Sequence, residues 1–304
     1  KNPDDSGPVD EWSHFVNVLM LDRDGNRINR RNPQDIFTPL YDHQIPPGAA
    51  NVMHYRLDVP KDVKGPVELR ARLRYRKFDY EYMAIVHKDK PVPKLPIVDI
   101  AQDKVTLPVE GFPLPADLKQ ESPIKPPWQR WNDYGIANLI EGGIGNKKGH
   151  RIQAAEAFRK VLALNVPDAE GLGHLNLARV LVEDSNWTEA ARELELAKKS
   201  TPPAPWWTVT FFQAEVNAVN ASRKEDYDAV IADLETILNP DVQPRERKFD
   251  FTQDYVVINT LANRIFKRSL LEESGSEAER ELLLKAARRA ESVLKLDSED
   301  VEAH

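Results

Sequence analysis

The chain has 304 residues, of which 41% are hydrophobic and 30% charged, and its formal net charge is -7 at pH 7. This length allows two domains with sizeable cores, and the negative charge argues against a nucleic-acid partner. The absence of cysteine excludes disulfides, thiolate nucleophiles, zinc–thiolate sites and covalent haem c attachment within this chain. No apolar run approaches the roughly 18 residues of a membrane-spanning helix, so we predict no membrane span.

The first third of the sequence has the two-residue period of β-strands. Residues 14–21 predict a strand that enters a turn at Asp24-Gly25, and residues 51–59 predict another strand. In residues 67–76, apolar side chains alternate with charged ones, which predicts one face on a core and one in water. The charged face includes Arg70, Arg72, Arg74 and Arg76. We therefore predict an antiparallel β-sandwich of Greek-key or immunoglobulin-like type over residues 1–112.

Prolines are concentrated in residues 91–127, which contain nine of the 23 in the chain. Such a segment excludes a continuous helix or a central strand. We place a linker at residues 113–127. An all-α domain is expected to follow at residues 128–304.

The stretch HLNLARVLVEDSNWTEAARELELAKKSTP, residues 174–202, has the spacing of a two-helix tetratricopeptide repeat of about 34 residues. Ala178 and Ala190 take the small-residue positions, where the two helices are expected to cross. The other matching residues are His174, Leu177, Leu181, Leu194, Ala197 and Pro202.

Neighbouring segments repeat this spacing. Upstream, the matching residues are Trp131, Tyr134, Gly135, Ala154, Phe158 and Val161. Downstream, Trp206, Trp207, Phe211 and Phe212 predict a first helix, and a second is expected to begin near Tyr227. A fourth pair is predicted from Ile258, Leu261, Ala262, Ile265, Ala286, Ala290 and Val293. We predict a solenoid of about four repeats, cut short in a fifth at His304, and expect either that the natural polypeptide continues or that its end is disordered.

A solenoid of this kind has an inner surface, formed mostly by the first helices, that binds proteins. Tryptophan is enriched at interface hot spots. The predicted protein-binding residues are Trp128, Trp131, Trp206, Trp207 and Phe211. The alternative for Trp131 and Trp207 is that they fill the large-residue position of their repeats, whereas for Trp128 and Trp206 the two interpretations are equally open.

The sequence has no arrangement typical of an enzyme or a metal site. Its seven histidines are scattered, and no two have the i, i+4 spacing of a helical metal site. The acidic pair Asp22 and Asp24 lies in a DRDGN string that lacks the later glutamate of a calcium loop. We predict a non-catalytic protein with no cofactor in this chain.

Several segments resemble one family beyond the generic repeat. They are DRDGNRINRRNPQDIFTPLYDHQIPPGAANVMHYRLDVP, LRARLRYRKFDYEY, PPWQRWNDYGIA, PAPWWTVTFF and KFDFTQDYVVIN. Together they are similar to the C-terminal half of bacterial multihaem c-type cytochromes that carry a tetratricopeptide tail. In that family a haem-bearing region rich in CxxCH precedes the β-rich module.

The resemblance implies a periplasmic or cell-surface setting and a protein partner, either a c-type cytochrome or a periplasmic redox enzyme. It implies haem c only in that partner or in an upstream region. The matching HQIPPG segment contributes His43, whose neutral imidazole is a suitable ligand for the haem of a neighbour. The alternative for His43 is a turn that starts the strand after Gly48.

Two functions are therefore expected. The first is a protein–protein interaction scaffold associated with a multihaem cytochrome or a periplasmic redox enzyme. The alternative is the accessory half of an electron-transfer cytochrome whose haem region lies upstream, or a structural subunit that organises a redox enzyme into a larger assembly.

Overall fold

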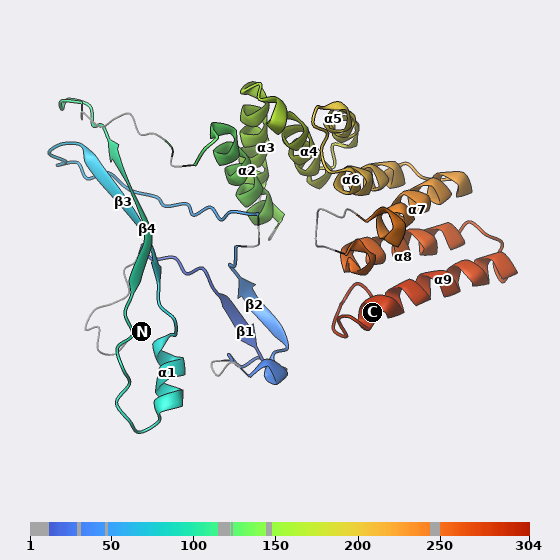
Figure 1. Cartoon of the computed structure of the whole chain (residues 1–304), viewed down its shortest axis with the longest axis horizontal. Coiled ribbons are helices and arrows are strands. Elements are labelled where there is room, and N and C mark those ends of the chain that lie inside the picture. The colour runs from blue at the N-terminus through green and yellow to red at the C-terminus, as the bar shows by residue number, and fades with distance from the viewer. Residues whose placement is uncertain are drawn as a thin grey trace. The chain divides into compact units, whose positions relative to one another are not determined.

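The structure is a computed structural model that describes residues 12–28, 32–45, 48–114, 122, 124–143, 148–243 and 250–304. The chain divides into two compact units, which we call unit 1 (Lys1–Lys125) and unit 2 (Pro126–His304). Figure 1 shows strands in the first and helices throughout the second. Most of the predicted linker, residues 115–121 and 123, lies outside the described residues.

In its described residues, unit 1 holds two separate antiparallel sheets of two strands each. The described elements are β1 (Val18–Leu21), η1 (Pro33–Asp35), β2 (Thr38–Asp42), β3 (Val67–Tyr75), α1 (Tyr80–His87) and β4 (Val98–Leu107). Strand β1 pairs with β2, and β3 pairs with β4. Strand β4 lies between Pro96 and Pro108, and every strand of a two-stranded sheet is an edge strand, where flanking prolines are tolerated.

The predicted β-sandwich is wrong. Residues 51–59, expected to be a strand, form none. In the described residues no second sheet covers the apolar face of β3, and Leu69, Leu73 and Tyr75 remain 43%, 51% and 54% exposed. The two-residue period correctly predicts a pleated strand with two unlike faces, but it contains no information about which element covers the apolar one.

The charged face of the β3–β4 sheet is locally neutralised. Arg74 pairs across the strands with Asp99 at 3.1 Å between Nε and Oδ1, and Glu68 pairs with both Arg70 and Lys104. All five side chains are exposed, which agrees with the prediction that this face lies in water.

The local signals of unit 1 have mixed outcomes. Gly25 has a φ of 79°, and its N–H donates to the carbonyl oxygen of Asp22 at 3.1 Å, so the predicted turn at Asp24-Gly25 is confirmed. Helix α1 was not predicted. It begins after Asp79, whose carboxylate accepts a hydrogen bond from the N–H of Tyr82 at 2.7 Å, an N-cap that satisfies one of the free N–H groups of the first turn.

Unit 2 contains eight α-helices in its described residues. They are α2 (Pro127–Gly143), α3 (Lys148–Ala163), α4 (Pro167–Glu183), α5 (Trp187–Lys199), α6 (Trp206–Val219), α7 (Lys224–Leu238), α8 (Tyr255–Ser269) and α9 (Glu277–Leu294). Short 3-10 turns, η2 (Pro240–Val242) and η3 (Phe251–Gln253), precede α8. Each helix packs on the next in the chain, so the unit is a row of helix pairs (Figure 1).

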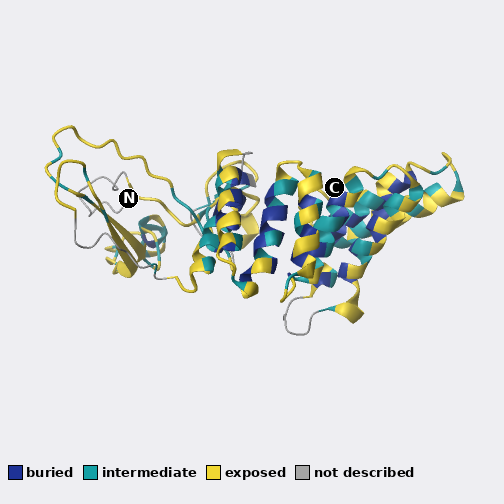
Figure 2. Ribbon diagram, turned by 90° about the horizontal axis from the view of Figure 1, so that it is seen from above, coloured by how far each residue is buried: buried dark blue, intermediate teal, exposed yellow. Residues whose placement is uncertain are grey.

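Small residues lie where paired helices meet, as the sequence spacing predicts. Ala178 of α4 and Ala190 of α5 are fully buried in one core cluster with Leu194. At the contact of α2 with α3, a Cβ added to Gly135 would lie only 2.5 Å from Cε1 of Phe158, which is itself fully buried. Figure 2 shows buried residues along most of these helices. Interhelical close packing is therefore the main source of apolar burial in unit 2.

The odd and even helices of unit 2 differ in their contacts. Helix α2 packs on α4, and α4 packs on α6, more extensively than α3 does on α5 or α5 on α7. In the first three pairs, the first helices are therefore closer together than the second helices, and this part of the row curves toward them. We call α2, α4 and α6 the inner layer.

Candidate functional site

Trp128 and Trp131 lie on the first turns of α2 and are half-buried. The ring of Trp131 is contacted by Nζ of Lys160 from α3, 4.1 Å from the ring centroid, and Tyr134 packs edge-on against it at 6.3 Å. A lysine over an indole face is a favourable cation–π contact. These contacts give Trp131 a role within its own helix pair.

The other three predicted binding residues lie on α6. Trp206 and Trp207 meet edge to face at 5.9 Å, and Trp207 also packs against Phe251 at 5.4 Å. Trp207 and Phe211 both contact the core cluster formed by α7, α8 and α9, whereas Trp206 is 37% exposed. The predicted set is therefore divided between α2 and α6, and α4 packs on both helices.

His43 follows β2 in unit 1 and is half-buried. Its imidazole stacks on that of His14 at 5.0 Å and lies 4.8 Å from the ring of Tyr41. The backbone N–H of His43 donates to the backbone carbonyl oxygen of Asn17 at 2.9 Å. Pro46 and Pro47 of the same segment lie outside the described residues. Haem ligation by His43 stays a prediction.

The Asp22 carboxylate is engaged by its own turn. It accepts hydrogen bonds from the N–H of Asn26 at 2.8 Å and of Asp24 at 3.0 Å, and these bonds, that of Asn26 foremost, lower the pKa of Asp22. Across the described residues, no group of three or more His, Cys, Asp or Glu side chains is arranged to hold a metal ion.

A row of polar side chains crosses the inner layer and was not predicted. Nδ2 of Asn176 on α4 donates to Oδ1 of Asn132 on α2 at 2.9 Å, and both residues are buried. Oδ1 of Asn176 in turn accepts from Nη1 of Arg179 at 3.0 Å. The guanidinium of Arg179 lies 5.9 Å from the ring centroid of Phe212 on α6, so one connected set of side chains joins all three inner helices.

Asp133 ends this row on α2, where its carboxylate hydrogen-bonds the side chain of Asn132. Burial raises the pKa of Asp133, and the bond from Asn132 partly opposes that rise. The first two bonds run the same way, because Arg179 donates to Asn176 and Asn176 donates to Asn132. We call Arg179, Asn176, Asn132 and Asp133 the inner polar row.

Arg179 differs from the other mostly buried arginines of unit 2. Arg151 pairs with Asp184 at 2.6 Å, and Arg264 pairs with Glu215 at 2.8 Å. Arg179 forms no salt bridge with any residue in the described part of the chain. Burial lowers the pKa of Arg179, and the attraction of Glu183 one turn along α4 offsets only part of that shift.

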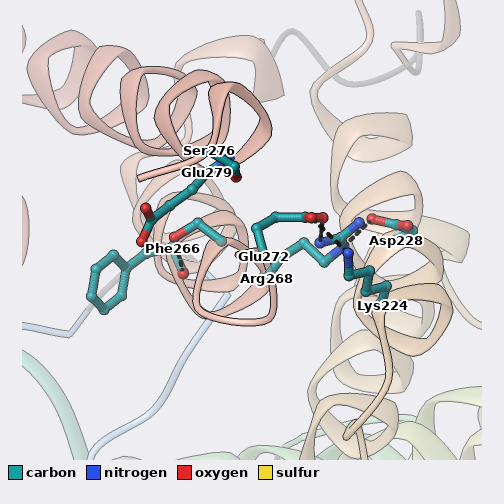
Figure 3. Close-up of polar contacts among 8 residues, drawn as sticks. Lys224, Asp228, Phe266, Arg268, Glu272, Ser276 and Glu279 are labelled. Carbon is teal, nitrogen blue, oxygen red and sulfur yellow. Dashed lines mark hydrogen bonds and ion pairs between the residues drawn. The ribbon is translucent and has the colours of Figure 1, made fainter. Parts of the chain in front are cut away.

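Arg268 shows the opposite arrangement (Figure 3). Its Nε lies 2.8 Å from Oδ1 of Asp228, and its Nη1 lies 2.6 Å from Oε1 of Glu272, which also pairs with Lys224 at 2.6 Å. Burial acts to lower the pKa of Arg268, but the hydrogen bonds to Glu272 and Asp228 outweigh it and the pKa is raised. This network joins α7 to the end of α8, and its charges are internally matched.

Sequence reasoning missed the inner polar row because its members occupy unassigned positions of the repeat. Asn176 and Arg179 flank Leu177 and Ala178, the positions that the repeat does specify. The available signal was the i, i+3 spacing of these two polar residues, which places them on one face of α4.

No protein-family model, curated protein sequence or solved structure shows significant similarity to this chain. Within the described residues, none of the helices combines the length and apolarity required for a membrane span.

Proposed function

We propose that unit 2 is a tetratricopeptide-type solenoid whose inner layer binds a partner protein, and that the chain acts as a non-catalytic scaffold. The observation that carries this proposal is the one-sided packing of α2, α4 and α6, which curves the row of helix pairs. Curved helical stacks of this kind use their concave side as an extended binding surface.

The helix contacts support the repeat assignment. Ala178 and Ala190, at the predicted crossing positions, and Ala197, another matching position of the repeat, are fully buried between α4, α5 and the start of α6. Each of the first three pairs supplies one helix to the inner layer and one to the outer side. The same unit is thus repeated along the chain, which is how repeat proteins build a continuous core from local contacts.

The resemblance to multihaem cytochromes suggests the class of partner, a c-type cytochrome or another periplasmic redox protein. It also suggests a periplasmic or cell-surface location. Haem c would belong to that partner or to a region upstream of this sequence, because these 304 residues include no cysteine to attach it.

A photo-crosslinking experiment tests the scaffold. A benzoyl-phenylalanine at Glu183, exposed on α4 in line with Asn176 and Arg179, should capture the partner in extracts of the native host. The same residue at Arg192, exposed on the outer helix α5, is the matched control. Equal capture from both positions, or from neither, would contradict binding by the inner layer.

The two tryptophans of α6 sharpen this test. Trp207→Ala should lower the unfolding midpoint, because Trp207 packs against Phe251 and the core of α7 to α9. Trp206→Ala should leave the midpoint nearly unchanged and weaken capture if Trp206 docks the partner. If the Trp206 variant captures the partner as well as the wild type does, Trp206 is not part of the binding surface.

A second candidate is favoured by the exposed apolar face of the β3–β4 sheet in unit 1. In this alternative, the chain is the accessory half of an electron-transfer cytochrome, and that face packs against a haem-bearing region of the same polypeptide. Haem staining of the protein purified from its native host separates the two candidates. One haem-positive band that also carries this sequence supports the second candidate, whereas a separate haem-positive protein supports the first.

A further inference from the structure

We propose that Arg179, oriented by Asn176, binds a side-chain carboxylate of an acidic segment in the partner protein. This inference rests on the proposed function, since it specifies the chemistry of the partner that the inner layer binds. In this proposal, the positive charge of Arg179 in the inner polar row selects a ligand with a negative charge.

The first support is the contrast among buried arginines. A guanidinium withdrawn from water is costly unless a carboxylate or hydrogen bonds compensate it. Arg151, Arg264 and Arg268 each have an Asp or Glu oxygen at 2.6 to 2.8 Å. Among the described residues, Arg179 has a hydrogen bond to one amide oxygen and a contact with one aromatic ring, but no salt bridge. An incoming carboxylate would supply the partner that the other three arginines already have.

The second support is the number of free donors. A guanidinium carries five N–H groups in a rigid fork that matches a carboxylate in a bidentate arrangement. One group, at Nη1 of Arg179, donates to Oδ1 of Asn176 at 3.0 Å. That bond fixes the plane of the fork and leaves other N–H groups for a ligand. Arg179 is half-buried, so a ligand can reach it from the solvent.

The orientation of Asn176 is itself fixed. Its Nδ2 is held by Oδ1 of Asn132, a buried residue 44 positions earlier in the chain. Because both ends of the Asn176 amide are engaged, the amide oxygen faces Arg179. The site therefore depends on the packing of α2 against α4, and Asn176 and Asn132 are positioning residues.

The side chains of Asp and Glu are the expected ligand groups, because all three matched arginines of unit 2 use them. Two carboxylates of the chain lie near the site and set the competing interpretation. Glu183 attracts Arg179 along α4, and Asp133 lies at the far end of the inner polar row. If these two groups neutralise Arg179, no external anion is needed.

Binding of defined peptides to the full chain tests the site. The probes are a fluorescein-labelled Gly–Ser peptide with several spaced aspartates and a C-terminal amide, and the same peptide with asparagines. We expect the aspartate peptide to bind at least tenfold more tightly than the asparagine peptide, and Arg179→Gln to abolish that preference. Arg192→Gln, an equal loss of charge on outer α5, is expected to change affinity less than twofold.

Three results would overturn the proposal. An equal loss of affinity in the Arg179 and Arg192 variants would indicate unspecific attraction. A wild-type chain that does not distinguish the two peptides would exclude the site. Tight binding of an asparagine peptide with a free C-terminal carboxylate would show that chain ends, and not acidic side chains, are the ligands.

Stability measurements separate binding from a structural role. Arg179→Met should lower the unfolding midpoint only slightly, because the gain from removing a cation that has no salt bridge offsets the loss of its hydrogen bond to the buried Oδ1 of Asn176. Arg268→Met should lower it, because it leaves Asp228 and Glu272 without their partner. A large fall for Arg179→Met would show that Glu183 and Asp133 already neutralise it, and would overturn the proposal.

The scaffold and the carboxylate site can fail separately. If crosslinking from Glu183 still captures the partner in the Arg179→Gln background with unchanged yield, the scaffold stands and the site is excluded. If no partner is captured from the inner layer in the wild-type chain, the scaffold itself is excluded.

Discussion

Unit 1 and unit 2 carry equally regular apolar patterns with opposite outcomes. In unit 2, Leu194 and Phe158 are fully buried, whereas in unit 1, Leu73 and Ile100 on the paired strands β3 and β4 are 51% and 60% exposed. A helix repeat meets its covering element next in the sequence, and so the pattern and its burial arise together. A two-stranded sheet has no such local cover and buries little by itself.

The largest expected effect contrasts these two environments directly. Leu194→Ala should destabilise unit 2 by about 2–5 kcal/mol, because it leaves a cavity in a closed core. Leu73→Ala should change the free energy of unfolding by no more than about 0.5 kcal/mol, because its side chain is already in water. Urea titrations of the full chain followed by circular dichroism measure both. A comparable loss from Leu73→Ala would show that the strand face is covered in the intact protein.

A second contrast concerns glycine. Gly135→Ala should cost about 1–3 kcal/mol, because the new methyl group overlaps the buried ring of Phe158. Gly65→Ala in unit 1 meets nothing within 4 Å and is the matched control, with an expected change of zero or a small gain. Thermal unfolding of the two variants reports the difference. Equal midpoints would mean that α2 and α3 separate without cost.

The loss of stability of unit 2 in acid should be smaller than the effects of the two substitutions above, and it should depend on the ion pairs of Glu272. Hydrogen bonds from Lys224, and then from Arg268, lower the pKa of Glu272 below its ordinary value of 4.5. A carboxyl group with a lowered pKa in the folded state stabilises the fold above its unfolded pKa, and this contribution is lost as the pH falls through the folded pKa. The unfolding midpoint of unit 2 should therefore fall as the pH drops below 4.5.

Glu272→Gln isolates that contribution. The variant should have a lower midpoint than the wild type at neutral pH, and a weaker fall in acid. Glu189→Gln, on the exposed side of α5, is the control and should follow the wild-type acid profile. If the Glu272 variant loses stability in acid in the same way as the wild type, the network in Figure 3 does not contribute to that loss.

Breaking an exposed ion pair should have the smallest effect on the free energy of unfolding, and the effect should be similar in unit 1 and unit 2. Arg74→Ala breaks an exposed pair with Asp99 in unit 1, and Arg192→Ala breaks an exposed pair with Glu189 in unit 2. Each should change the free energy of unfolding by about 0–1 kcal/mol, because water and salt screen exposed pairs. A clearly larger effect in unit 1 would assign its sheet more stabilisation from charge than its burial suggests.

Local signals in the sequence predicted much of unit 2 correctly. The first helix expected from Trp206, Trp207 and Phe211 is α6, and the small residues Ala178 and Ala190 are buried at the predicted crossing. Helix α7 begins at Lys224, near the expected start at Tyr227. These predictions succeed because a helix pair is closed by residues close in sequence, whose spacing records which side chains touch.

The candidate site was predicted less well, for a related reason. Trp206 and Trp207 were named, but the structure uses Trp207 for the core and leaves Trp206 half exposed. The bond between Asn132 and Asn176 spans 44 positions, and no local pattern relates the two residues. Long-range polar pairs of this kind depend on how successive helix pairs stack.

The sequence by itself determined the periods, the turn at Gly25, the helix pairs and the exclusion of thiol chemistry, because each follows from local sterics or from composition. Tertiary structure alone decided that the apolar strand faces of unit 1 stay exposed and that Arg179 is half-buried without a salt bridge to any described residue. Burial and charge matching are properties of what comes to lie beside a residue, and distant segments of the chain supply those neighbours.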